Sequence, residues 1–173
     1  MNKFVFVFAA AALIPASPAH TQLAKQSMAA EPLTCPLDLP YDQNNPFALI
    51  LRGEVPGSRV YEDPQVIVLV PLEWDHPGHA LVIPRNPVRS LLDMTPADIA
   101  HALDIARRVG LAQQRAFGST GFSIVQNNAR NQHVCHVHFH VIPNTPRETR
   151  RELRQEERDT MAARLTAAFP APE

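Results

Sequence analysis

Several features are scarce in this sequence, and each shortage excludes a class of function. The formal net charge is only −1, so there is no basic excess to make nucleic acid or an anionic membrane an obligatory partner. The six glycines form neither G-x-G-x-x-G nor G-x-x-x-x-G-K-[ST], so phosphate would have to be held by side chains and a few amides. Without repeats or low-complexity blocks, the 173 residues predict a single globular domain that acts on a small molecule.

The apolar run at residues 4–14 is too short to span a bilayer. It follows Lys3 and precedes small residues that include Ser17 and Ala19, an order typical of a secretory signal. We therefore expect residues 1–19 to be a signal peptide and the mature chain to be exported, periplasmic or secreted, without a membrane contact. The alternatives are an uncleaved anchor and a chance apolar start.

Cysteine is also scarce, with only Cys35 and Cys135. Export would permit a disulfide between them, although two cysteines so far apart can equally remain free, and the sequence leaves the pairing open. If the residues around Cys135 form a strand, its side chain points away from that of His136, so we do not expect a catalytic thiol.

The order of predicted elements describes an α+β domain over residues 45–173, preceded by an extended arm over residues 20–44 that contains three prolines. Asn45, Pro46 and Gly53 delimit a short helix, and Thr95 with Pro96 starts a long helix that should end near Phe117. Five strands and a C-terminal helical segment are expected at residues 59–62, 65–70, 80–83, 122–125, 136–143 and 147–169. Short connections between the first three strands favour a mostly antiparallel sheet.

The stretch HVHFHVIP, which starts at His136, places three histidines at every second position. In a strand this spacing puts His136, His138 and His140 on one face, and the intervening apolar residues on the other. Such a face could bind a metal with a further ligand from elsewhere, or carry a nucleophilic imidazole with flanking residues that orient it. A polar sheet face without function is the third possibility, and the residues alone do not separate the first two.

This stretch resembles the His-x-His-x-His-x-x signature of the histidine triad (HIT) family of nucleotide hydrolases and transferases. The resemblance covers about residues 41–144 and includes the upstream segments 45–56, 60–63, 77–84 and 91–96. It implies a HIT-like α+β fold with a five-stranded, mostly antiparallel sheet, one long helix and a C-terminal helix. It also implies a homodimer formed by extending the sheet, and catalysis without a metal or other cofactor.

The resemblance also implies roles for individual residues. His138 would attack the α-phosphate of a nucleotide conjugate, His136 and His140 would orient it, and His79 would be a fourth histidine from a neighbouring strand. Gln132 would contact the phosphate or leaving group, and Asn127 would support the phosphate site. The apolar base pocket would consist of Phe47, Ile50, Leu69 and Leu72, although apolar residues of this kind are more often simply core.

Two departures from the family pattern stand out. Pro71 occupies the position of an acidic residue that holds the ribose, and it offers neither an acceptor side chain nor an N–H; Glu73 or Asp75 in the next turn is the possible substitute. The loop from Asn127 to Gln132 is about two residues shorter than usual, with Asn131 in place of glycine. Asparagine tolerates positive φ better than other non-glycine residues, so the turn can survive.

The sequence therefore predicts a metal-independent hydrolase of nucleoside 5′-phosphoramidates or dinucleotide-like phosphoanhydrides, with a nucleotidyl-histidine intermediate. The alternative is a catalytically weak protein that keeps the same scaffold and binds nucleotide or a transition metal. Pro71 and the shortened loop are the features that favour the alternative.

Overall fold

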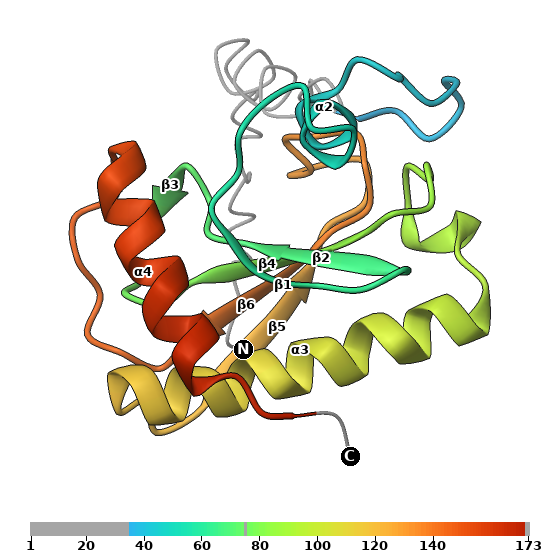
Figure 1. Ribbon diagram of the computed structural model, residues 1–173. Helices are drawn as coiled ribbons and strands as arrows, with labels where there is room; N and C mark the ends of the chain where they lie inside the picture. Colours follow the sequence, from blue (N-terminus) through green and yellow to red (C-terminus); the bar gives the residue numbers. More distant parts are fainter. Residues whose placement is uncertain (1–34, 75, 172–173) are drawn as a thin grey trace, which may run out of the picture. The chain divides into compact units, whose positions relative to one another are not determined.

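A computed structural model describes residues 35–74 and 76–171. The expected signal peptide (residues 1–19), the first part of the arm (residues 20–34) and Asp75 lie outside the described residues. Within them the chain forms the α+β domain that the sequence predicts (Figure 1).

The main sheet has five strands in the order β1-β2-β4-β6-β5, and every neighbouring pair is antiparallel. This arrangement confirms the predicted five-stranded sheet. The strands are β1 (Arg59–Glu62), β2 (Val66–Leu69), β4 (Ala80–Pro84), β5 (Phe122–Gln126) and β6 (Phe139–Pro143). A second, two-stranded sheet pairs β3 (Glu73–Trp74) with β7 (Arg151–Glu152). Two-residue strands carry no periodic pattern, so the sequence did not predict them.

The long helix α3 (Pro96–Phe117) has the predicted limits. The hydroxyl of Thr95 accepts a hydrogen bond from the Asp98 N–H at 3.1 Å, which satisfies a donor of the first turn. The helix ends at Gly118, whose φ of +65° suits glycine.

The two faces of the main sheet are covered differently. Helices α3 and α4 (Gln155–Ala168) pack on one face and form the larger core with the alternate side chains of the strands. Helix α2 (Pro46–Leu51) lies on the opposite side of the sheet from α3 (Figure 1). Beneath α2 is a small apolar cluster of buried residues, namely Phe47, Ile67, Leu69, Leu81 and Ile83.

The prediction of a strand over all three triad histidines is wrong at its start, because β6 begins only at Phe139. Upstream of it the backbone bonds outside the β4–β6 ladder: His136 N–H donates to the nearby Val134 carbonyl at 2.8 Å, and Val137 N–H donates to the distant Val88 carbonyl at 2.9 Å. The strand that should pair here, β4, ends at Pro84, which has no N–H to offer a ladder.

The predicted helical segment 147–169 is likewise shorter than expected, since α4 begins at Gln155. Arg151 is used in the small sheet and pairs with Glu157 at 2.9 Å. The Glu157 carboxylate also accepts from the Arg154 N–H at 2.9 Å. These bonds to the first turn of α4 fix its start after Arg154.

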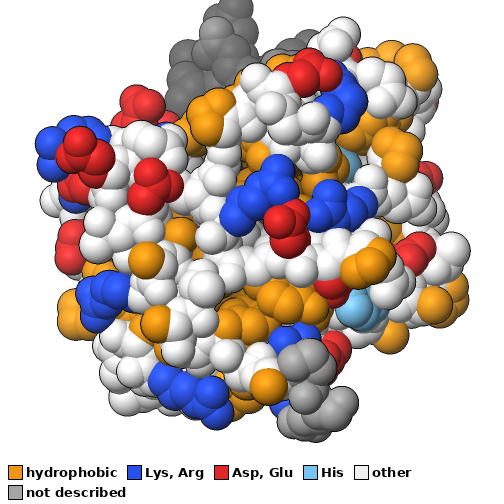
Figure 2. Space-filling view, viewed as in Figure 1, with side chains coloured by type: hydrophobic (Ala, Val, Ile, Leu, Met, Phe, Trp, Pro, Cys, Tyr) orange, Lys and Arg blue, Asp and Glu red, His pale blue; other side chains and the backbone are white. Residues whose placement is uncertain are grey.

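Basic and acidic side chains are interspersed on the face of the molecule shown in Figure 2. At the β1 edge, Glu62 accepts from both Arg59 at 2.6 Å and Arg85 at 2.8 Å. Two guanidinium groups therefore share one carboxylate at this edge.

Candidate functional site

His138 has one ring nitrogen engaged by the backbone. Its Nδ1 lies 2.7 Å from the carbonyl oxygen of His136, and because a carbonyl oxygen can only accept, Nδ1 must carry the hydrogen. Neutral His138 therefore has its lone pair on Nε2. Burial lowers the pKa of His138 below its usual value of 6.5, which keeps the ring neutral near pH 7. A neutral imidazole with a defined lone pair is a competent nucleophile.

His136 is fully buried and bonded at both ring nitrogens. Its Nε2 donates to the Pro84 carbonyl at 2.7 Å, so its Nδ1 is the acceptor for the Tyr41 hydroxyl at 2.5 Å. Burial lowers the pKa of His136 to about 4. His136 is thus held as a neutral imidazole in one tautomer, between a strand end and the arm.

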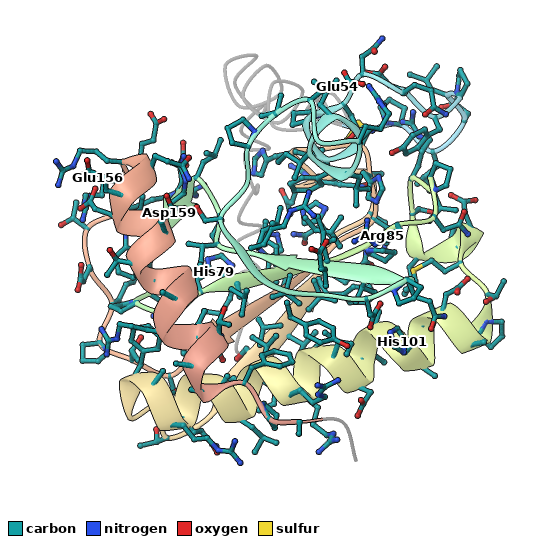
Figure 3. The ribbon with its side chains drawn as sticks, viewed as in Figure 1. Glu54, His79, Arg85, His101, Glu156 and Asp159 are labelled. Carbon is teal, nitrogen blue, oxygen red and sulfur yellow. A yellow bond between two sulfur atoms is a disulfide. The ribbon has the colours of Figure 1, made fainter. Side chains whose placement is uncertain are left out.

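His140 lies on β6, and His79 directly precedes the neighbouring strand β4. His140 Nδ1 is 3.1 Å from His79 Nε2. Figure 3 labels His79 at the start of β4. Burial, followed by the neighbouring histidines, lowers the pKa of His140 to about 3. The ring centroid of His140 lies 5.0 Å from that of His138. The structure therefore brings together all four predicted histidines.

The predicted base-pocket residues come together in part. The Phe47 ring centroid lies 5.0 Å from that of His138, while Leu69 belongs to the small apolar cluster and Ile50 packs against it. Gly57 is held close to this wall, because a Cβ there would lie 3.0 Å from Ile50 Cγ2. Leu72 is 61% exposed and is not part of the cluster, so the structure groups only three of the four.

Gln132 is fully buried and bonds to protein groups. Its Nε2 donates to the Arg89 carbonyl at 2.6 Å and lies 3.3 Å from the His136 carbonyl, and its Oε1 accepts from the Ala129 N–H at 3.2 Å. In this conformation Gln132 ties the loop to the backbone beside the triad. Its contact with phosphate stays a prediction.

Asn127 is half-buried and follows β5 directly. Its backbone carbonyl accepts from Gln126 Nε2 at 2.8 Å, and its role at phosphate stays a prediction. The loop beyond it turns through Ala129 at φ +54° and Asn131 at φ +65°. The left-handed turn at Asn131 is therefore formed without glycine, as expected for asparagine.

Glu73, a possible substitute for the ribose-binding acid, is already paired. Its carboxylate accepts from Arg150 Nη2 at 2.8 Å, and both side chains are more than half exposed. Arg150 is also among the positive groups that lower the pKa of His140. An ion pair of this kind therefore lies near the rim of the site.

Sequence reasoning missed the residues that attach the arm to the site. Arg89, only 8% exposed, donates through Nη1 to the Pro40 carbonyl at 2.6 Å and through Nη2 to the Pro36 carbonyl at 2.5 Å. Cys35 and Cys135 form a disulfide, which answers the question that the sequence left open. The two cysteines were the only sequence signal that this segment is attached to the site. Tyr41 gave no such signal, because it lies 95 residues from its partner His136.

Within residues 35–74 and 76–171, no group of three or more His, Cys, Asp or Glu side chains is arranged to hold a metal ion. No helix in this part of the chain is both long and apolar enough to cross a membrane.

Comparison with known proteins places the chain in a family. Residues 52–147 match the HIT domain. Adenosine 5′-monophosphoramidase hnt1 of Schizosaccharomyces pombe is 30% identical over 99 residues, which are 56% of this chain and 71% of that protein.

Solved structures agree with this match. A Hit-like protein involved in cell-cycle regulation from Bartonella henselae has a TM-score of 0.70 and 34% identity, and the match covers 76% of this chain and all of that one. A zinc-bound histidine triad protein from Mycobacterium smegmatis has a TM-score of 0.63 and 29% identity, over 70% of this chain and 90% of that one. With its HIT domain match over more than half of its length, the chain belongs to the HIT family.

Proposed function

We propose that the protein hydrolyses nucleoside 5′-phosphoramidates or dinucleotide-like phosphoanhydrides through a nucleotidyl-His138 intermediate. One observation carries this proposal: the His136 carbonyl accepts a hydrogen bond from His138 Nδ1, with 2.7 Å between oxygen and nitrogen, which leaves the lone pair of His138 on Nε2. The similarity to a protein named adenosine 5′-monophosphoramidase supports the substrate class.

In the first step, Nε2 of His138 attacks the α-phosphorus. A bond forms between Nε2 and phosphorus, and the bond from phosphorus to the leaving nitrogen or oxygen breaks with its electron pair. The imidazole becomes positively charged, and the hydrogen bond from Nδ1 to the His136 carbonyl strengthens as this charge develops. His140 and His79 lie beside His138 and are placed to pass a proton to the leaving group.

In the second step, water attacks the same phosphorus and the bond to Nε2 breaks. The nucleoside monophosphate leaves, the proton released by the water replaces the one that His140 and His79 passed to the leaving group, and neutral His138 is restored. Phe47, Ile50 and Leu69 supply an apolar surface for the base beside His138. Pro71 offers no acceptor side chain for the ribose, and Glu73 is paired with Arg150, so we expect weak discrimination between ribose and deoxyribose.

The test is turnover of adenosine 5′-phosphoramidate with and without chelator, by the wild type and by His138→Ala. We expect chelator-resistant hydrolysis that falls at least about 10³-fold in the variant, because the covalent route is lost. His101→Ala is the matched control. His101 lies on α3, away from the triad, and its side chain pairs with that of Asp63. Equal activity of His138→Ala and the wild type would overturn the proposal.

A metal-binding function is the second candidate, and one contact favours it: His79 Nε2 and His140 Nδ1 lie 3.1 Å apart. The zinc-bound relative from Mycobacterium smegmatis makes the same metal the natural probe. Stoichiometric zinc in untagged protein, together with loss of zinc in His140→Ala and no turnover of the phosphoramidate, would replace the hydrolase proposal with this one.

The expected homodimer and export belong to the same proposal. Strand β5 ends the sheet order and exposes Ile124 and Val125 at 40% and 39%, so its edge can pair with a second copy. Analytical ultracentrifugation of the wild type and of Val125→Lys tests the dimer, which we expect the charge to weaken. Detection of a shortened chain in the periplasmic fraction tests export, and the full-length precursor in the cytoplasm would contradict it.

A further inference from the structure

Tyr41 reaches the triad from the arm, upstream of the segment that matches the HIT domain at residues 52–147. Its hydroxyl lies 2.5 Å from His136 Nδ1, and the two ring centroids are 5.5 Å apart in an edge-on arrangement. We infer that Tyr41 is a positioning residue for catalysis. Its hydroxyl fixes the orientation and the neutral state of His136, and His136 in turn orients the nucleophile His138. This inference rests on the proposed hydrolase function.

The direction of the hydrogen bond follows from the partners of His136. Because Nε2 donates to the Pro84 carbonyl at 2.7 Å, neutral His136 has only an acceptor left at Nδ1, and a buried acceptor requires a donor. The Tyr41 hydroxyl supplies it. Burial raises the pKa of Tyr41 above its usual value of 10, so the phenol keeps its hydrogen throughout the neutral pH range.

The effect of Tyr41 passes to His138 through the backbone of His136. The carbonyl of His136 is the acceptor that places the His138 hydrogen on Nδ1, and Gln132 Nε2 lies 3.3 Å from the same oxygen. A His136 ring held at both nitrogens anchors the Cα of His136, and so restrains the backbone that carries this carbonyl. Orientation of a nucleophile to within a fraction of an ångström is a large part of catalysis.

Tyr41 is itself held by contacts on both sides in the sequence. Upstream, the Arg89 guanidinium binds the carbonyls of Pro36 and Pro40, and the disulfide at Cys35 fastens the arm to Cys135. Downstream, Asn45 donates to the Asp42 carbonyl at 2.6 Å and caps α2 through the Ala48 N–H at 3.0 Å. The arm is therefore preorganised to present its hydroxyl to the triad.

Tyr41→Phe tests the inference, because it removes only the hydroxyl. We expect kcat to fall about tenfold, the equivalent of one buried hydrogen bond, with little change in KM because the base and phosphate contacts remain. Without a donor at Nδ1, His136 takes up a proton more readily. The acid limb of the kcat profile should therefore move to higher pH, a shift that a general loss of packing would not produce.

The sequence provides a matched control in its only other tyrosine. The hydroxyl of Tyr61 donates to Asp63 at 3.1 Å, and its ring stacks on Phe169, away from the triad. Tyr61→Phe should leave kcat and its acid limb unchanged. If Tyr41→Phe matches the wild type in both, the inference is overturned.

A second measurement needs neither activity nor a variant. Nitrogen-15 NMR of the histidine rings should show His136 protonated at Nε2 and His138 protonated at Nδ1, with His136 Nδ1 shifted by an accepted hydrogen bond. A His136 ring protonated at Nδ1 would overturn the inference even if Tyr41→Phe fails to fold. If the NMR result is as expected but the wild type does not turn over substrate, the proposed hydrolase function fails while the Tyr41 contact stands.

Discussion

The main sheet presents two faces that differ in how they are covered. On one face, α3 and α4 lie over alternate strand residues that are almost all apolar. On the other, α2, the arm and the loop before β6 surround four histidines above the small apolar cluster. Strand β6 serves both, because Phe139 and Val141 enter the larger core while His140 points to the site. The alternation of a single strand thus separates the larger core from the candidate site.

Ile105→Ala should produce the largest effect on the helix-covered face. Ile105 is fully buried in the larger core, so its truncation removes apolar contacts and leaves a cavity, at a cost of about 3–4 kcal/mol in the free energy of unfolding. Chemical denaturation measures this cost. If the two faces are independent, kcat of the folded variant stays within about twofold of the wild type. A large fall in kcat would show that the faces are coupled.

Removal of the disulfide should act on the histidine-bearing face. The bond joins residues separated by 100 positions, and opening such a loop costs about 2–4 kcal/mol of stability. Replacement of both cysteines by serine, compared with the oxidised wild type, gives this value by denaturation. Hydrogen exchange should become faster in residues 35–44 and 129–135 and remain slow in α3. Uniformly faster exchange would contradict a local role for the bond.

Acidification should distinguish the same two faces with a smaller effect. The pKa values of His136 and His140 are about 4 and about 3 in the folded chain, below the usual 6.5. Between these values and 6.5 the unfolded chain binds more protons, so their contribution is complete above pH 6.5 and is lost as pH falls. For each histidine we expect a loss of about 2 kcal/mol between pH 7 and pH 5.

Denaturation at both pH values measures this loss, and His140→Gln should reduce it by removing one of the two buried titrating groups. Measurements at high salt separate the effect from repulsion between surface charges. An unchanged pH dependence in His140→Gln would contradict the assignment.

The elements that the sequence predicted correctly are those with local signals. Thr95, Pro96 and Gly118 delimit α3 through caps that act over a few residues. The short apolar runs of β2 and β4 are likewise recognisable from their own residues. The start of β6 was misassigned because the alternation of residue types does not show where pairing with a neighbouring strand begins. The difference depends on Val88 and Pro84, which are distant in sequence.

In the candidate site, too, local motifs could be predicted from the sequence, whereas contacts between distant segments could not. The four histidines were predicted from a motif, and the structure brings their rings together. Leu72 was placed in the pocket with Leu69, but it lies beyond the end of β2, where its side chain is exposed. Tyr41 and Arg89 carry no local signal, since their partners become neighbours only when residues 35–44 pack on the domain.

The Cys35–Cys135 bond also makes the domain a covalent ring with a tail. The ring contains α2, α3 and His79, whereas the three triad histidines, β6 and α4 lie on the tail that leaves it at Cys135. A single backbone cut anywhere in the ring, such as a protease would make in the exposed loop at Arg130, leaves both pieces joined. The histidines of the two segments would then stay on one molecule, and such a nicked protein could retain its site.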